Sequence, residues 1–225
     1  MHTELLIQPA IQGLLAPALF TVLWLVMLLV AEQRESLQGK WLTKPLASAG
    51  FLWLALLHGL PATGWGRAMI AAFALCWVGD VLLIPKDKRA FLAGLGAFLL
   101  GHVAFAVAFA WRGLDRRAVA AVALPLAMGA VLVLQWLWPH LSRTMRGPVV
   151  AYIAAICSMV ALAMGTSTLH PDGAIVVGAV AFFASDLAVA RNRFVSPGFL
   201  NRAWGLPLYY GAQLLLAAAV LHAST

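Results

Sequence analysis

Long apolar runs separated by short polar connections make up most of this chain. A helix that crosses a bilayer needs about 20 mainly apolar residues, and each run is close to that length. Helix-breaking residues such as Gly39, Pro85 and Pro139 fall in the connections. The pattern predicts an all-α polytopic membrane bundle in which residues 1–225 form one domain. Its eight transmembrane helices are expected at residues 14–31, 43–60, 67–85, 90–111, 117–138, 148–166, 172–190 and 203–222.

The composition requires lipid as the outer solvent of this bundle. Hydrophobic residues make up 63% of the chain and charged residues 10%, against about 25% charged in an ordinary soluble domain. Two cysteines, Cys76 and Cys157, both lie inside apolar runs and form no disulfide framework. The stretch from Met1 to Leu15 contains no Lys or Arg, so it lacks the basic start of a secretory signal, and the first run is interpreted as a helix.

The net charge of +7 is interpreted as a topology signal. The 15 Lys and Arg residues lie almost entirely in the short connections, which argues against a nucleic-acid surface. With both termini outside, eleven basic residues fall on the cytoplasmic side and four on the outer side, including the discordant cluster from Arg112 to Arg117. We therefore expect this orientation in a bacterial cell membrane, which is the inner membrane if the source is a double-membraned bacterium.

Asp80 and Asp186 are the strongest functional signal in the sequence. An aspartate at the centre of a spanning helix costs about 2.5–3.5 kcal/mol, so it faces the bundle or a wet cavity. From Pro85 and Arg191, helix rise puts each carboxylate about 7–9 Å inside the cytoplasmic boundary. We expect a shared functional site; the alternative is two separately satisfied structural carboxylates.

Several pairs of polar residues are separated by nearly constant offsets. Lys44 and Tyr152, Asp80 and Asp186, and His102 and Gln213 are 108, 106 and 111 residues apart. An offset of four helices preserves helix direction, so the pairs are compatible with a parallel 4+4 duplication about an axis along the membrane normal.

The remaining intramembrane polar residues are candidate lining residues. His102 shares a helix face with four aromatic or small residues, and it is either a hydrogen-bonded packing residue or, with the two aspartates, a zinc ligand. No metal-ligand spacing supports zinc, and no serine-hydrolase elbow or phosphate-cradling loop is present. The candidate substrate-binding residues are Lys44, His102, Tyr152, Tyr209, Tyr210 and Gln213, and neither a metal nor a cofactor is expected.

The order of these motifs resembles the lysoplasmalogenase (YhhN-like) membrane family over roughly residues 20–220. The resemblance rests on Thr43-Lys44-Pro45-Leu46, on Gly79-Asp80-Val81-Leu82-Leu83 and on Phe91, Gly94, Phe98 and His102 at their spacing. It also rests on Tyr152, on Gly178-Ala179 through Ser185-Asp186 with Phe194, and on Tyr209-Tyr210 with Gln213. Phe105 departs from the family pattern, in which a tyrosine is expected.

The resemblance implies eight helices and hydrolysis of the vinyl ether of 1-alkenyl lysophospholipids, with the paired aspartates carried over to Asp80 and Asp186. The chemistry suits the residues, because a buried pair of carboxylates can keep one proton near neutral pH. Cys76, Trp77 and Leu83 give Asp80 the more apolar neighbours along the chain, which favours Asp80 as the acid. A proton-coupled transporter or lipid carrier that uses the same aspartates is the alternative, and a zinc-dependent lipid amidase is a third reading.

Overall fold

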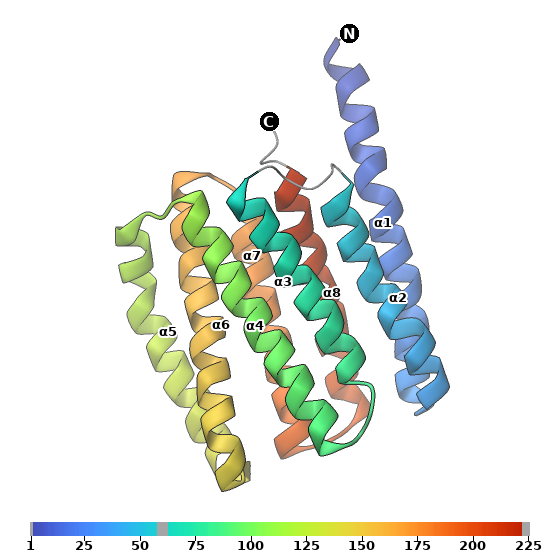
Figure 1. Cartoon of the computed structure of the whole chain (residues 1–225), viewed down its shortest axis with the longest axis vertical. Helices are drawn as coiled ribbons and strands as arrows, with labels where there is room; N and C mark the ends of the chain where they lie inside the picture. Colours follow the sequence, from blue (N-terminus) through green and yellow to red (C-terminus); the bar gives the residue numbers. More distant parts are fainter. Residues whose placement is uncertain (1, 58–62, 222–225) are drawn as a thin grey trace.

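The computed structural model describes residues 2–57 and 63–221, and these residues are almost entirely helical (Figure 1). Two short irregular turns join the helices: a 3₁₀ turn, η1 (Trp138–His140), and a π-helical turn, η2 (Arg191–Val195). The long helices of the described part are α1 (His2–Gln33), α2 (Leu37–Leu56), α3 (Gly64–Leu82), α4 (Lys88–Arg112), α5 (Arg116–Leu137), α6 (Arg143–Leu169), α7 (Gly173–Ala190) and α8 (Phe199–Leu221).

Most helices begin earlier than the apolar runs predict, because polar side chains cap their first turns. Ser36 accepts a hydrogen bond from the Gly39 amide, so α2 starts at Leu37 and Gly39 lies inside the helix, where a break was expected. Asp87 and Asp115 cap α4 and α5 in the same way. The predicted ends at residues 60 and 222 lie outside the described residues.

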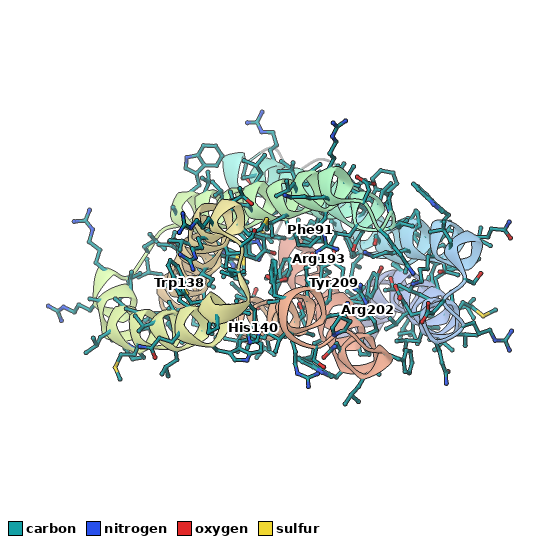
Figure 2. The ribbon with its side chains drawn as sticks, turned by 90° about the horizontal axis from the view of Figure 1, so that it is seen from below. Phe91, Trp138, His140, Arg193, Arg202 and Tyr209 are labelled. Atoms are coloured by element: carbon teal, nitrogen blue, oxygen red, sulfur yellow. The ribbon has the colours of Figure 1, made fainter. Side chains whose placement is uncertain are left out.

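The helices form a flattened bundle in which α1 and α2 occupy one edge and α5 the other (Figure 1). Helices α3 and α4 lie in front of α7 and α8, with α6 beside α4. The first residues of α1 and the last residues of α8 lie at the same end of the bundle. The view from below shows this layered arrangement end on (Figure 2).

Seven helices within the described part are long and apolar enough to cross a membrane: α1 and α3 to α8. These helices confirm the prediction of an all-helical membrane protein. Helix α2 is not among these seven, and Lys40 and Lys44 interrupt its hydrophobic run. Lys44 is nevertheless buried, which requires α2 to pack into the bundle at that level.

Close packing between helices depends on small residues. An added Cβ at Gly79 of α3 would lie 2.7 Å from the ring of Phe98 on α4. One at Gly178 of α7 would lie 2.9 Å from Leu216 on α8. Glycine therefore allows each of these helix pairs to approach closely. Within α5, by contrast, which the structure describes completely, Leu137 is the one buried residue.

Arg112, one of the cations that do not fit the predicted orientation, has structural partners. The Arg112 guanidinium lies over the ring of Trp65, 4.9 Å from its centroid, and Arg112 Nη1 is 3.7 Å from Asp172 Oδ2. His170 Nε2 lies 2.9 Å from the Arg112 carbonyl oxygen. Arg112 thus joins the end of α4 to the starts of α3 and α7, which explains a cation at this position without reference to topology.

Candidate active site

One cavity of about 100 Å³ lies inside the bundle and contains both intramembrane aspartates in its wall. This volume is enough for several water molecules or a segment of a hydrocarbon chain. Side chains from α2 to α8 and from η2 contribute to the wall, which is mainly apolar. The view from below shows Phe91, Tyr209 and Arg202, all of which line the cavity (Figure 2). Its apolar lining includes Leu83, Leu95, Phe98, Val133, Leu137, Ile153, Ile156 and Phe183.

Asp80 is surrounded by hydrogen-bond donors from α2 and α8. Lys44 Nζ lies 3.2 Å from Asp80 Oδ1, and both side chains are almost fully buried. The hydroxyls of Ser48 and Tyr209 each donate to Asp80 Oδ2 at 2.6 Å. Ser48 Oγ also lies 3.0 Å from the Lys44 carbonyl oxygen and 3.1 Å from Tyr210 OH. We call these five residues the Lys44 cluster.

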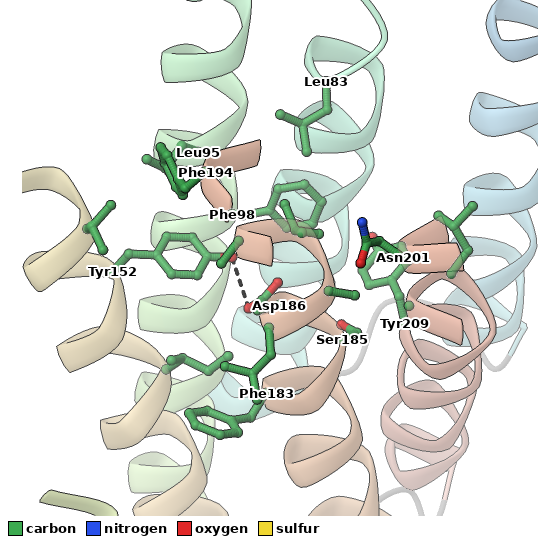
Figure 3. A pocket seen from close by; sticks show the side chains of 18 of the residues that line it. Leu83, Leu95, Phe98, Tyr152, Phe183, Ser185, Asp186, Phe194, Asn201 and Tyr209 are labelled. Carbon is green, nitrogen blue, oxygen red and sulfur yellow. Dashed lines mark hydrogen bonds between the residues drawn. The ribbon is translucent and has the colours of Figure 1, made fainter. Parts of the chain in front are cut away.

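Asp186 has fewer partners and is more open to the cavity. Tyr152 OH donates to Asp186 Oδ2 at 3.0 Å (Figure 3). His102 Nε2 lies 3.4 Å from the same oxygen, while His102 Nδ1 lies 2.7 Å from the carbonyl oxygen of Phe98. The Asp186 side chain is 16% exposed, whereas the His102 side chain is completely buried. We call Asp186, Tyr152 and His102 the His102 cluster.

The site residues predicted from the sequence differ in how directly they contact the cavity. Asp80, Asp186, Lys44, Tyr152 and Tyr209 line it directly. His102 and Tyr210 lie behind this wall and contact it through Asp186 and Ser48, respectively. Gln213 is fully buried in α8 and is not part of the wall.

Sequence reasoning missed several polar residues of the site, among them Ser48, Asn201 and Arg202. Ser48 lies one helical turn after Lys44, on the same face of α2, and that spacing is a signal that could have identified it. Asn201 lines the cavity, where it accepts a hydrogen bond from Arg191 and donates to the Ser196 carbonyl, fastening η2 to α8. Arg202, which was interpreted as a topology signal, also lines the cavity.

The site combines two carboxylates, one ammonium group and three phenols in a mainly apolar enclosure. Such a site can hold a proton on one carboxyl and a negative charge on the other. The described residues contain no group of three or more His, Cys, Asp or Glu side chains that could hold a metal ion.

Several known proteins similar to this chain are named lysoplasmalogenases. Lysoplasmalogenase of Mycobacterium bovis is 35% identical over 160 residues, which are 68% of this chain and 59% of the relative. Lysoplasmalogenase TMEM86A of Homo sapiens is 33% identical over 180 residues, which are 76% of this chain and 73% of the relative. Lysoplasmalogenase TMEM86B of Homo sapiens is 31% identical over 176 residues, 78% of this chain and 71% of the relative.

The chain thus spans less than two thirds of the length of the mycobacterial relative. No solved structure matches this chain. The model of the YhhN family, however, matches residues 39–220, which run from α2 to the end of α8. Because this match includes every residue of the Lys44 and His102 clusters, and most of the chain, the protein belongs to the YhhN family.

Proposed function

We propose that this chain is a membrane hydrolase that cleaves the vinyl ether of 1-alkenyl lysophospholipids, giving a fatty aldehyde and a glycerophospho-headgroup. The observation that carries the proposal is the presence of Asp80 and Asp186 in the wall of one mainly apolar cavity. The relatives support it, since the mycobacterial and human proteins are named lysoplasmalogenases. Membership of the same family supports a shared activity.

The proposed reaction needs one acid and one negatively charged partner. A proton adds to the outer alkenyl carbon, and the resulting oxocarbenium ion is captured at the inner carbon by water. The water gives up a proton, and the hemiacetal collapses as its bond to the glycerol oxygen breaks and that oxygen is protonated. General acid catalysis of this kind contributes about 10²–10⁴ in rate. The two aspartates are proposed to supply the acid and the negative partner.

The distribution of charge around the cavity supports an amphiphilic substrate. Lys44 and Arg202 are the basic residues of the wall, and they accompany the carboxylates. The walls from α5 and α6 are apolar, with Val133, Ile153 and Ile156. A phosphate headgroup would lie toward the two cations and the alkenyl chain would follow the apolar wall. This arrangement leaves the vinyl ether beside the carboxylates.

We further propose that α2 is the eighth transmembrane helix, that both termini lie outside, and that the protein resides in the inner membrane. The buried Lys44 on α2 and the common end of α1 and α8 support this topology. A 4+4 duplication is also proposed. Lys44 of α2 contacts the aspartate of α3, and Tyr152 of α6 contacts the aspartate of α7 in the same way.

The function can be tested with purified protein in lipid nanodiscs, supplied with 1-alkenyl, 1-alkyl and 1-acyl lysophospholipids that share one headgroup. We expect aldehyde from the alkenyl lipid alone, because the alkyl ether has no carbon that accepts a proton. The ester would need a nucleophile and an oxyanion site. Asp80→Asn and Asp186→Asn should each abolish aldehyde release while the protein remains monodisperse.

Two results would contradict the proposal. Fatty acid release from the acyl lipid, without aldehyde from the alkenyl lipid, would exclude the proposed mechanism. Proton-coupled movement of lipid across the bilayer, with no cleavage of any of the three, would instead favour the transporter or carrier function.

A further inference from the structure

We propose that Asp186 is the proton donor of this site and that His102 is the positioning residue that keeps the proton on it, whereas Asp80 stays ionised. The inference rests on the proposed function and assigns the two carboxylates different roles. It follows from the hydrogen-bond and ion-pair partners of each carboxylate among the described residues.

Asp80 lies beside a full positive charge and two hydroxyl groups. Oδ1 lies against the Lys44 ammonium, which has no lone pair, and Oδ2 accepts from the hydroxyls of Ser48 and Tyr209. The ammonium group stabilises the carboxylate form of Asp80 and cannot accept a proton from Oδ1. The carboxylate form satisfies all three contacts at once, so Asp80 is suited to be the permanent negative charge.

Asp186 faces an acceptor as well as a donor. The Phe98 carbonyl oxygen can only accept, so at 2.7 Å the hydrogen lies on His102 Nδ1. In a neutral ring, Nε2 then carries a lone pair, and Nε2 lies 3.4 Å from Asp186 Oδ2. Two lone pairs at this distance repel each other, and a proton on Asp186 relieves that repulsion. Among the described residues, Nε2 has no hydrogen-bond partner, so a protonated Asp186 would supply one.

The surroundings favour the carboxyl group as the holder of this proton. His102 is fully buried, and its ring packs against Phe182 and Tyr152, with centroids 4.4 and 5.2 Å away. An imidazolium ion in this apolar shell would lose its hydration. The Asp186 side chain is partly exposed to the cavity, where a substrate would lie. A neutral imidazole beside a protonated Asp186 is therefore the arrangement that fits the contacts.

Each bond of the reaction is accounted for by these roles. The O–H bond of Asp186 breaks as its proton forms the new C–H bond at the outer alkenyl carbon, which leaves Asp186 as a carboxylate. Water adds to the inner carbon and its released proton returns to Asp186, beside the Nε2 lone pair. Asp186 then donates this proton to the glycerol oxygen as the C–O bond of the hemiacetal breaks. The hemiacetal hydroxyl gives up its own proton to Asp186 as the aldehyde C=O bond forms, which restores the starting state.

Infrared spectroscopy of the protein in nanodiscs at neutral pH tests the assignment directly. We expect a carbonyl stretch of a protonated carboxylic acid that shifts on carboxyl-13C labelling of aspartate. The band should persist in Asp80→Asn and disappear in Asp186→Asn. In His102→Phe, which removes the acceptor, it should move to higher frequency, a change that a packing role for His102 would not produce. Tyr152→Phe should retain the band, because it leaves both the Asp186 carboxyl group and the His102 ring in place.

Other outcomes separate this inference from the proposed function. A band that is lost in Asp80→Asn, or no aspartic acid band at all, overturns the assignment even when the wild-type protein releases aldehyde. A wild-type protein that shows the Asp186 band but cleaves no vinyl ether supports the assignment and contradicts the function. If Asp186→Asn fails to fold, the Asp80→Asn spectrum still decides which carboxyl holds the proton.

Discussion

Replacing Lys44 with methionine should destabilise the protein strongly, and the structure sets the size of the effect. Lys44 and Asp80 form an ion pair in which the exposed fractions of the side chains are 6% and 3%. Removing one partner of a buried pair costs about 3–5 kcal/mol, because the other charge is left without compensation. For a chain of this length, 1 kcal/mol shifts the unfolding midpoint by about 2–4 °C. Together these magnitudes predict a midpoint for Lys44→Met that is about 6–20 °C lower.

The double variant Lys44→Met/Asp80→Asn distinguishes a lost charge partner from a simple packing defect. It removes both charges, so most of the lost stability should return, and the two single effects should be far from additive. Tyr209→Phe removes one hydrogen bond to the same carboxylate. That bond is worth about 1.5–3 kcal/mol, so this variant should fall between the wild-type protein and Lys44→Met.

Unfolding in detergent can be followed through the fluorescence of the nine tryptophans. Lys86→Met is the matched control. Its pair with Glu35 has a 3.8 Å separation and exposed fractions of 80% and 79%. Exposed pairs contribute little, so this midpoint should hardly move. A Lys44→Met midpoint close to that of Lys86→Met, or a double variant no more stable than the single one, would refute the buried ion pair.

Two further predictions concern the substrate. Arg202→Gln should raise KM about tenfold for the phosphate-bearing alkenyl lysolipid, because the loss of a charged hydrogen bond costs at least about 1.4 kcal/mol. The KM for a 1-alkenyl glycerol without phosphate should not change. The exposed Arg89→Gln is its control, and equal effects on both lipids would contradict a phosphate contact. Val133→Trp should lower aldehyde release from long-chain substrates more than from short-chain ones, because Val133 lines the cavity. Leu132→Trp, on the lipid-facing side of α5, should not discriminate by chain length, and a similar effect in both variants would exclude this wall as the chain path.

The helices and the buried polar residues could be predicted because membrane physics constrains them strongly. A charged residue within an apolar run must face inward, and Lys44, Asp80 and Asp186 all lie in the cavity wall. The helix ends were less predictable, since hydropathy marks the extent of the hydrocarbon layer. Caps such as Ser36 and Asp87 extend helices beyond that layer.

The partners of each aspartate could not be derived from neighbouring residues in the sequence. Cys76, Trp77 and Leu83 favoured Asp80 as the acid, but its donors Lys44 and Tyr209 come from other helices. The position of α5 at the edge of the bundle could not be predicted from the sequence either, because a side chain that faces lipid is as apolar as one that faces the core. Contacts between helices, which hydropathy does not encode, decide both features.

The identity of the residue beside each aspartate leads to a final prediction. On the proposed duplication, Tyr152 of α6 occupies the place that Lys44 occupies in α2, and each contacts the aspartate of the following helix. Lysine brings a full positive charge, which holds a carboxylate, whereas the Tyr152 phenol donates one neutral hydrogen bond and allows a proton on Asp186.

Tyr152→Lys should therefore convert Asp186 into a second ionised carboxylate and lower aldehyde release by about 10²–10⁴, the contribution of a general acid. Tyr152→Phe removes the hydroxyl without adding charge and should lose much less. The aldehyde assay on both purified variants, with their monodispersity checked, makes the comparison. Turnover by Tyr152→Lys equal to that of Tyr152→Phe would show that a neighbouring cation does not control the acid. The two aspartates would then owe their different roles to something other than the exchange of lysine for tyrosine.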